Sequence, residues 1–464
     1  MADQERFTDR MSDQDALMWN IEKDPVLRST ILAVAFLDQA PDWARLVDRF
    51  DRATLLIPRL RQRVVSPPFR LAPPSWSVER DFDLAFHMRR FRVPPPGDRR
   101  TVLDMLQPMA AASFDRARPL WECTLLEGLA DDGAAIVLKV HHSVTDGVGG
   151  MELLLHLIDL ERDATDPDDR PAVPAADDTG ALSLVRDSVG HTGRRVLGIA
   201  RRTPATVARG ALDAARDPLA AAVGSYITGR SIARTLAPAM RPMSPVMLER
   251  GLSRRLDSLD IPIDDLKRAA KAVNGSLNDA FVASVIGGLA RYHARHGTQP
   301  EQLRMTMPIN IRTESDAPAG NQFTPARFPV PATIADPKER MLAVGEIVRG
   351  WRAEPALALT GTLAGVLNRL PTVAVTALFG SMLKCCDFLT TNVPGAPVPV
   401  YIGGARVERF YAFAPPSGAA VNVALISHCD TCCIGVVTDT AAVPDADVLM
   451  ECLREGFAEV IAVG

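Results

Sequence analysis

The sequence predicts an α/β protein built from two domains. At 464 residues the chain is too long for one ordinary hydrophobic core. Strand-like and helical patterns alternate up to about Leu160, and a second region of the same kind begins near Met247. Between them, residues 161–179 are acidic, rich in proline and without periodicity, as in a linker. We therefore predict an N-terminal domain at 1–160, a linker and helical crossover at 161–246, and a C-terminal domain at 247–464.

Composition excludes several classes of protein. The hydrophobic content of 47% with 23% charged residues is that of a folded globular chain. A net charge of −4 leaves no basic excess for nucleic acid, and 5% aromatic residues offer few stacking platforms. No run of about 18 uncharged apolar residues predicts a membrane span, and the polar start Met1–Arg6 is unlike a signal peptide. We expect a cytoplasmic protein, with peripheral contact to the inner face of the membrane or to lipid droplets left open.

The seven cysteines do not predict a disulfide framework, because their number is odd and the expected compartment is reducing. Cys429 and Cys432 have the spacing of a metal knuckle. They lie, however, in an alternating run that leads into residues 434–437. We interpret these cysteines as small strand residues and expect no metal site.

The most informative stretch runs from Val140 to Gly147, Val-His-His-Ser-Val-Thr-Asp-Gly. Residues 120–126 and 134–140 predict two strands joined by a tight turn at Asp131–Gly133. This hairpin would hold His142 rigidly at a strand end. Gly147 would then let the chain turn into the apolar run 151–158, a predicted buried helix.

The residue types in this stretch indicate proton transfer. A fixed imidazole can take a proton from a hydroxyl and return one to a leaving group. Adjacent strand residues point to opposite faces, so we assign His142 as the base and His141 as a structural neighbour. Asp146 would brace the loop, with Arg312 as a candidate ion-pair partner. The sequence has no Gly-x-Ser-x-Gly elbow, so direct attack by an activated alcohol on an acyl donor fits better than a serine-bound intermediate.

The second half predicts further helices and strands. Ser276 is expected to cap a helix, because serine is favoured at that position. The predicted helices cover residues 263–270, 279–293 and 451–462, and the predicted strands cover residues 303–308, 388–393 and 421–427.

Residues 181–240 are rich in arginine and carry apolar residues at helical spacing. One interpretation is an amphipathic helix that lies on an anionic lipid surface. The other is a helix that crosses between the domains, with arginine stems covering apolar surface. Amphipathic character alone does not separate the two.

The pattern His141-His142-x-x-x-Asp146-Gly147 resembles the signature of the acyl-CoA-dependent acyltransferase superfamily, which includes chloramphenicol acetyltransferase and peptide-synthetase condensation domains. Other motifs resemble the bacterial wax ester synthase/diacylglycerol acyltransferase family, in the expected order over nearly the whole chain. They are Ser12–Ala16, Phe82–Leu84 with His87, Pro119–Trp121, Ser276–Ala280, Pro308–Arg312, Gly320–Gln322 and Thr391–Gly395. Thr391 replaces a common serine. Ser427–Asp430 replaces the Ser-Tyr-x-Gly of many members, which puts the choice of acceptor in question.

The resemblance implies two chloramphenicol-acetyltransferase-like lobes, each a mixed β-sheet flanked by helices, with the active site at their interface. It implies transfer of a long-chain acyl group from acyl-CoA to diacylglycerol or a long-chain alcohol, with no cofactor because CoA is a substrate carrier. Asn278 would stabilise the oxyanion near a helix start, which the resemblance favours over the alternative that Asn278 and Asp279 only cap the helix. The catalytic candidates are His142, His141, Asp146 and Asn278, and the substrate-binding candidates are Gly147, Pro119, Leu120, Trp121, Asp279 and Asn392.

Two alternatives remain open. One is a condensation-type enzyme that uses other thioester donors. The Pro119–Trp121 and Asn278–Asp279 elements argue against it. The other is a lipid-binding or droplet-associated paralogue with little turnover, against which intact His142 and Asp146 argue.

Overall fold

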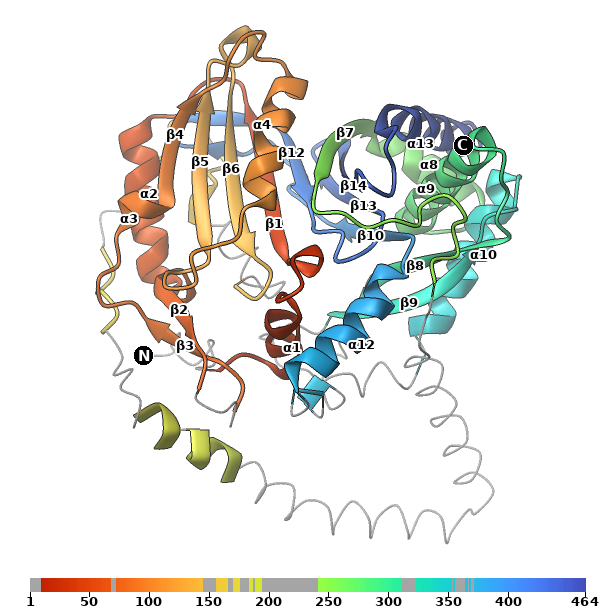
Figure 1. Cartoon of the computed structure of the whole chain (residues 1–464). Coiled ribbons are helices and arrows are strands. Elements are labelled where there is room, and N and C mark those ends of the chain that lie inside the picture. Colours follow the sequence, from red (N-terminus) through yellow and green to blue (C-terminus); the bar gives the residue numbers. More distant parts are fainter. Residues whose placement is uncertain are drawn as a thin grey trace, which may run out of the picture.

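The computed structural model describes residues 10–67, 72–144, 156–165, 170–175, 183–186, 188–193, 241–310, 323–352, 354, 364–365, 367–368 and 371–464. Two lobes lie side by side, each with its own sheet and its own helices (Figure 1). The predicted two-lobed α/β architecture is confirmed. No helix among the described ranges is both long enough and apolar enough to cross a membrane.

The N-terminal lobe is built on a six-stranded sheet with the order β11-β12-β1-β6-β5-β4. Strand β6 lies between β1 and β5 and pairs antiparallel with both. A small separate sheet joins β2 and β3. Along the chain, the helices and strands of this lobe up to β6 are α1 (Asp13–Ile21), β1 (Thr30–Leu37), α2 (Trp43–Leu56), β2 (Gln62–Val65), β3 (Ser75–Val78), α3 (Leu84–His87), β4 (Met88–Arg92), α4 (Arg99–Ala111), β5 (Trp121–Glu127) and β6 (Ala134–His141).

The C-terminal lobe has a second six-stranded sheet with the order β7-β14-β13-β10-β8-β9. Helices α8, α9 and α13 lie together beside this sheet (Figure 1). The remaining elements are β7 (Arg254–Pro262), α8 (Ile263–Ala272), α9 (Leu277–Arg295), β8 (Gln302–Asn310), β9 (Phe323–Pro331), α10 (Pro337–Arg352), α12 (Thr372–Lys384), β10 (Phe388–Val393), β11 (Tyr401–Ile402), β12 (Ala405–Phe413), β13 (Val421–His428), β14 (Thr431–Asp439) and α13 (Ala446–Ile461).

Most predicted elements form where the sequence places them. The hairpin β5–β6 is present, and its connection contains a short 3₁₀ turn in which Asp131 and Asp132 have φ values of 60° and 59°. Ser276 caps α9 as predicted. The closing helix begins at Ala446, five residues before the predicted start, because the apolar face of α13 already packs in the core at Leu449 and Met450. Of the predicted helix at 151–158, residues 151–155 lie outside the described part of the chain.

The cysteines predicted to be small strand residues include Cys432 and Cys433, which are buried in β14. Cys429 instead occupies the turn before β14, with a φ of 51°. Within the described part of the chain, no group of three or more potential metal ligands comes together.

Strands β11 and β12 cross from the C-terminal part of the sequence into the N-terminal sheet. Strand β12 pairs antiparallel with β1, with Leu32 opposite Phe413. Asp159 also bridges to Tyr401 through two backbone hydrogen bonds of 2.8 and 2.9 Å. Sheet membership therefore does not follow the sequence boundary at residue 247, because residues 401–413 complete the first sheet.

A shared apolar cluster joins the two lobes. It combines Leu32 of β1, Leu106 of α4 and Tyr411 of β12 with Leu256 of β7 and Val437 of β14. Burial of such side chains contributes roughly 1.5–3 kcal/mol each, so this cluster is a large part of what holds the lobes together.

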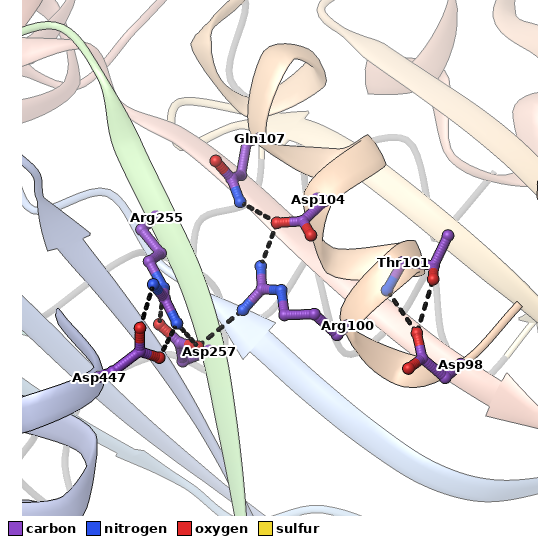
Figure 2. A network of polar contacts seen from close by, with 8 residues as sticks. All are labelled: Asp98, Arg100, Thr101, Asp104, Gln107, Arg255, Asp257 and Asp447. Atoms are coloured by element: carbon purple, nitrogen blue, oxygen red, sulfur yellow. Dashed lines mark hydrogen bonds and ion pairs between the residues drawn. The ribbon is translucent and has the colours of Figure 1, made fainter. Parts of the chain in front are cut away.

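Polar contacts line the same interface (Figure 2). Arg100, on α4, donates to Asp257 of β7 and to Asp104, each at 2.7 Å. Arg255 binds Asp257 at 3.0 Å and also contacts Asp447. Burial raises the pKa of Asp257 above its usual range, although both arginines act in the opposite direction. The pairs are partly exposed, so each adds at most about 1 kcal/mol, and the pair Arg100–Asp257, which joins the lobes, specifies their alignment more than their stability.

The crossover needs a glycine where strands from the two lobes meet. A Cβ atom built on Gly435 of β14 would lie 2.1 Å from the carbonyl oxygen of Ala412 in β12. We predict that Gly435→Ala lowers the free energy of unfolding by roughly 1–3 kcal/mol, because the two backbones must separate. Urea denaturation measures the loss.

The matched control is Gly350→Ala near the end of α10, where a Cβ atom would meet nothing within 4 Å. This variant should be neutral or more stable by roughly 0.5–1 kcal/mol, since alanine favours helix. Equal stability of Gly435→Ala and the wild type would contradict the proposed close approach.

Candidate active site

The end of β6 holds the two adjacent histidines between neighbouring strands. His141 lies opposite Thr30 of β1, and its amide donates to the carbonyl of Leu120 at 3.0 Å. The amide of His142 donates to the carbonyl of Ser29 at 2.8 Å. The chain then turns, with the amide of Val144 bonded to the carbonyl of His141 at 2.9 Å. Backbone hydrogen bonds to both flanking segments therefore fix the position of the pair.

His141 is buried and its ring is held from both sides. Nδ1 accepts the amide of Ser143 at 3.1 Å and lies 2.7 Å from the Ser143 hydroxyl. Nε2 lies 2.9 Å from a carboxylate oxygen of Glu22. Because Nδ1 accepts an N–H, the neutral ring carries its proton on Nε2 and donates it to Glu22. Trp19 packs edge-on against the ring, with centroids 5.4 Å apart. These contacts hold the ring of His141 in place at the end of β6.

Glu22 is a nearly buried carboxylate, with 7% of its side chain exposed. Burial alone would raise its pKa. The hydrogen bond and charge of His141, the amide of Ser29 and the guanidinium of Arg116 act against burial and hold the pKa of Glu22 below its ordinary value. Glu22 is therefore a carboxylate at neutral pH.

His142 has a different environment. Its Nδ1 is buried and has no hydrogen-bond partner in the described part of the structure. Burial, together with the neighbouring His141, lowers the pKa of His142 to about 4, while its own backbone and the charge of Glu22 act in the opposite direction. The ring is therefore neutral at physiological pH and can accept a proton, as a general base requires.

Several predicted site residues lie outside the described part of the chain. They are Asp146, Gly147 and the candidate ion-pair partner Arg312.

The segment Pro119–Trp121 lies in the core. Trp121 donates its indole N–H to the carbonyl of Leu60 at 2.8 Å and stacks on the ring of Phe50, with centroids 5.7 Å apart. His87 stacks on the other side at 4.5 Å, and its Nδ1 lies 2.7 Å from the carbonyl of Trp121. Leu120 is completely buried. These contacts are packing contacts that support the hairpin of β5 and β6.

The start of α9 separates the roles of Asn278 and Asp279. The carboxylate of Asp279 accepts the amide of Ser276 at 2.8 Å, and the Ser276 hydroxyl accepts the amide of Asp279 at 3.2 Å, which is a capping box. Capping thus accounts for Asp279. The Nδ2 of Asn278 lies 3.8 Å from the sulfur of Met307, a weak acceptor. The amide of Asn278 is partly exposed and can still donate to a ligand.

Asn392 lies near the end of β10, opposite Leu425 in the parallel strand β13. The turn that follows β10 needs Gly395, because a Cβ atom there would lie 2.1 Å from the carbonyl oxygen of Ser427. His428, one of the residues that departs from the family pattern, is buried, and its Nε2 lies 3.0 Å from the carbonyl of Val407 in β12. The departure therefore lies where the C-terminal lobe meets the crossover strand.

A pocket opens between the lobes. Its lining includes Arg28 and Thr30 from the N-terminal lobe, Arg254 and Leu256 of β7, and Phe413 of the crossover strand β12. Thr30 pairs with His141 through the backbone, whereas neither histidine is among the residues that line this pocket.

Comparison with known proteins defines the family. The profile of the wax ester synthase/diacylglycerol acyltransferase catalytic domain matches residues 11–281, and the profile of the WS/DGAT C-terminal domain matches residues 319–460. The chain belongs to the wax ester synthase/diacylglycerol acyltransferase family. It is therefore an O-acyltransferase. Sequence resemblance predicted both the family and this reaction class, and both are confirmed.

Relatives match most of the chain. A Mycobacterium tuberculosis H37Rv protein provisionally named a diacylglycerol O-acyltransferase is 39% identical over 458 residues, covering 99% of this chain and 93% of its own. A second protein of that strain, with the same provisional name, is 30% identical, and the match covers 86% of this chain and 79% of that protein.

Solved structures share the fold. The wax ester synthase/diacylglycerol acyltransferase from Marinobacter aquaeolei VT8 superposes with a TM-score of 0.63 at 20% identity, covering 98% of both chains. The first condensation domain of the calcium-dependent antibiotic synthetase gives a TM-score of 0.59 at 16% identity, covering 97% and 95%.

Glu22, Ser29 and Ser143 are contacts of the histidine pair that sequence reasoning missed. Glu22 follows α1 and lies 119 residues before His141 in the chain. A single glutamate after a short helix gives no local signal of this pairing, which only the folded structure reveals.

The environment of His142 generates a pH prediction. A base must be unprotonated, and the pKa of His142 is lowered to about 4. We predict that kcat/KM for acyl transfer rises as pH increases through about 4 and is level between about 6 and 8, where the base is fully unprotonated. Initial rates in overlapping buffers test this. An acid limb near the ordinary imidazole value of about 6.5 would contradict it.

Proposed function

We propose that the protein transfers a long-chain acyl group from acyl-CoA to the hydroxyl of diacylglycerol or of a long-chain alcohol, with no metal or other cofactor. The observation that carries this proposal is His142 itself, whose backbone is fixed at the end of β6 by a hydrogen bond to Ser29 and whose buried ring is neutral at physiological pH. Family membership supports the reaction class, and the names of the relatives support diacylglycerol as an acceptor.

In the proposed mechanism His142 takes the hydroxyl proton of the acceptor as its oxygen attacks the thioester carbonyl. The amide of Asn278, at the N-terminal end of α9, would donate to the oxyanion that forms, aided by the helix dipole. When the intermediate collapses, the C–S bond breaks and His142 returns its proton to the CoA sulfur. Asp146 would organise the loop after β6, and His141 holds the strand end. Gly147 and Asn392 remain candidates for substrate contact, whereas the contacts of Trp121 and Asp279 are structural.

The alternative donors are thioesters other than acyl-CoA. The fold is shared with condensation domains. One of them, a variant of the rhizomide synthetase starter condensation domain, was solved in complex with C8-CoA. It superposes with a TM-score of 0.57 at 13% identity, and the match covers 98% of this chain and 94% of that one. A fold that accommodates an acyl-CoA in that protein is compatible with the proposed donor.

The deciding assay incubates the purified protein with palmitoyl-CoA and either dipalmitoylglycerol or hexadecanol, and follows release of CoA together with the lipid product. Product with either acceptor supports the proposed function. Product only from an N-acetylcysteamine or carrier-protein thioester would support the condensation-type alternative. Lipid binding without product from any donor would support the low-turnover paralogue.

Substitution of the two histidines tests their division of labour. We predict that His142→Ala lowers kcat by roughly 100- to 10,000-fold, because the general base is lost. His141→Ala should cost less, since its ring contacts only structural partners. Circular dichroism verifies folding. Equal losses of rate in the two folded variants would refute this assignment.

The oxyanion donor is tested alongside. Asn278→Ala should lower kcat by roughly 100- to 1,000-fold with little change in KM, which is the loss found when one such donor is removed. Asp279→Asn should instead lower stability, since its carboxylate completes the helix cap.

We also propose a cytoplasmic protein that contacts a membrane or lipid droplet through the arginine-rich segment 181–240. Most of this segment, with Arg194, Arg195, Arg201 and Arg202, lies outside the described residues. The support is its composition and the water-insoluble acceptors. Arginines that reach an anionic surface add roughly 1 kcal/mol each to binding.

Neutralising these four arginines to glutamine should therefore weaken co-sedimentation with anionic vesicles and raise the apparent KM for emulsified diacylglycerol. Activity on a short soluble alcohol should stay within about twofold, since the proposed docking does not involve the catalytic residues. If the segment is instead a helix that crosses between the domains, the four substitutions should lower activity equally with both acceptors and lower the stability of the protein. Vesicle binding that is insensitive to salt would rule out electrostatic docking.

A further inference from the structure

Glu22 is a nearly buried carboxylate that contacts His141 and the segment whose backbone binds His142. The residue follows the last turn of α1, and its Oε1 accepts two hydrogen bonds, from Nε2 of His141 at 2.9 Å and from the amide of Ser29 at 2.6 Å. Its Oε2 lies 3.5 Å from Arg116. A carboxylate in the interior is costly unless hydrogen bonds compensate it, so its position indicates a specific role.

The two hydrogen bonds reach both sides of the pair. Through Nε2 the carboxylate fixes the tilt of the His141 ring, whose tautomer is set by the amide of Ser143 at Nδ1. Through Ser29 it acts on the backbone, because the carbonyl of Ser29 accepts the amide of His142 at 2.8 Å. Glu22 thus joins the segment before β1 to the end of β6, where the chain turns at His142.

We infer that Glu22 is a positioning residue for His142, acting through the ring of His141 and the peptide of Ser29. This inference rests on the proposed function, in which His142 is the base. Glu22 does not touch the reacting atoms. In the common arrangement the carboxylate binds the catalytic imidazole itself. Here the carboxylate orients one imidazole, and the neighbouring imidazole acts as the base.

The charge of Glu22 has a second effect on the same ring. Among the described residues, His141 and Glu22 are the titratable groups that act on His142, and Arg116 acts on Glu22. The negative charge of Glu22 raises the pKa of His142 while burial lowers it. Glu22 therefore makes His142 a stronger base than burial alone would allow. A role in stability only would not change this basicity.

Two substitutions separate geometry from charge. Glu22→Gln keeps an oxygen acceptor for His141 and Ser29 but removes the charge. Glu22→Ala removes both, and leaves two buried N–H groups unpaired. The matched control is Glu451→Gln, which alters an exposed ion pair with Arg295 on the far helices α13 and α9.

Each full-length variant is assayed with palmitoyl-CoA and hexadecanol, beside the wild type and His142→Ala. The ring nitrogens of the histidines are followed by ¹⁵N NMR of histidine-labelled protein. We expect Glu22→Ala to lower kcat by roughly 10- to 100-fold with KM within about twofold, and the Nε2 resonance of His141 to shift because its carboxylate acceptor is lost. Glu22→Gln should keep an acceptor for Nε2 and recover kcat to within roughly tenfold of the wild type, with the acid limb of kcat/KM moved to lower pH. Glu451→Gln should match the wild type.

If both Glu22 variants retain wild-type kcat while His142→Ala is inactive, the inference is wrong and the proposed function stands. Losses that only follow the folded fraction, with the Nε2 resonance of His141 unchanged in Glu22→Ala and the acid limb unchanged in Glu22→Gln, would also overturn it. If Glu22→Ala does not fold, Glu22→Gln decides alone, and an acid limb at the wild-type pH overturns the inference. A fully active His142→Ala would instead refute the proposed function itself.

Discussion

The antiparallel pairing of β12 with β1 is the interaction on which the rest of the structure depends. Strand β12 comes from the last quarter of the chain, yet it completes the first sheet and packs against β13 and β14 of the second. Since β1 lies between β12 and β6, the position of His142 is coupled to the contact between the lobes. Gly435 makes that contact close enough, because its missing side chain leaves room for the backbone of Ala412.

The two histidines show how adjacent residues acquire different properties. In the described part of the structure His141 binds the carboxylate of Glu22, whereas Nδ1 of His142 is buried without a partner and burial lowers the pKa of that ring to about 4. A buried polar atom without a partner costs on the order of 1–3 kcal/mol, and such costs are common where a chemical function requires them. The negative charge of Glu22 raises the pKa of His142 against the effect of burial, which links the end of the first helix to the proposed chemistry.

The start of α9 shows the same separation of roles. Asp279 is used by the helix itself, through a capping box with Ser276. Asn278, one residue earlier, keeps an amide that points only to a sulfur atom. Helix N-termini favour negative charge, so an uncommitted amide there suits an oxyanion. The segment Pro119–Trp121 has no such uncommitted group among its described contacts. The contacts of Trp121 with Leu60, Phe50 and His87 are all structural.

Sequence by itself determined the two-lobed α/β class, the hairpin that carries His142, the cap at Ser276 and the family, because these follow from local periodicity, turn residues and motifs in order. It also predicted that His141 and His142 differ, since neighbouring residues of a strand face opposite ways. Only the tertiary structure decided that β11 and β12 complete the first sheet, that Asp279 is a cap, and that Glu22 holds His141. These features pair groups that lie far apart in the chain, and no local pattern encodes such a pairing. They depend instead on which buried groups must find partners once the sheets have formed.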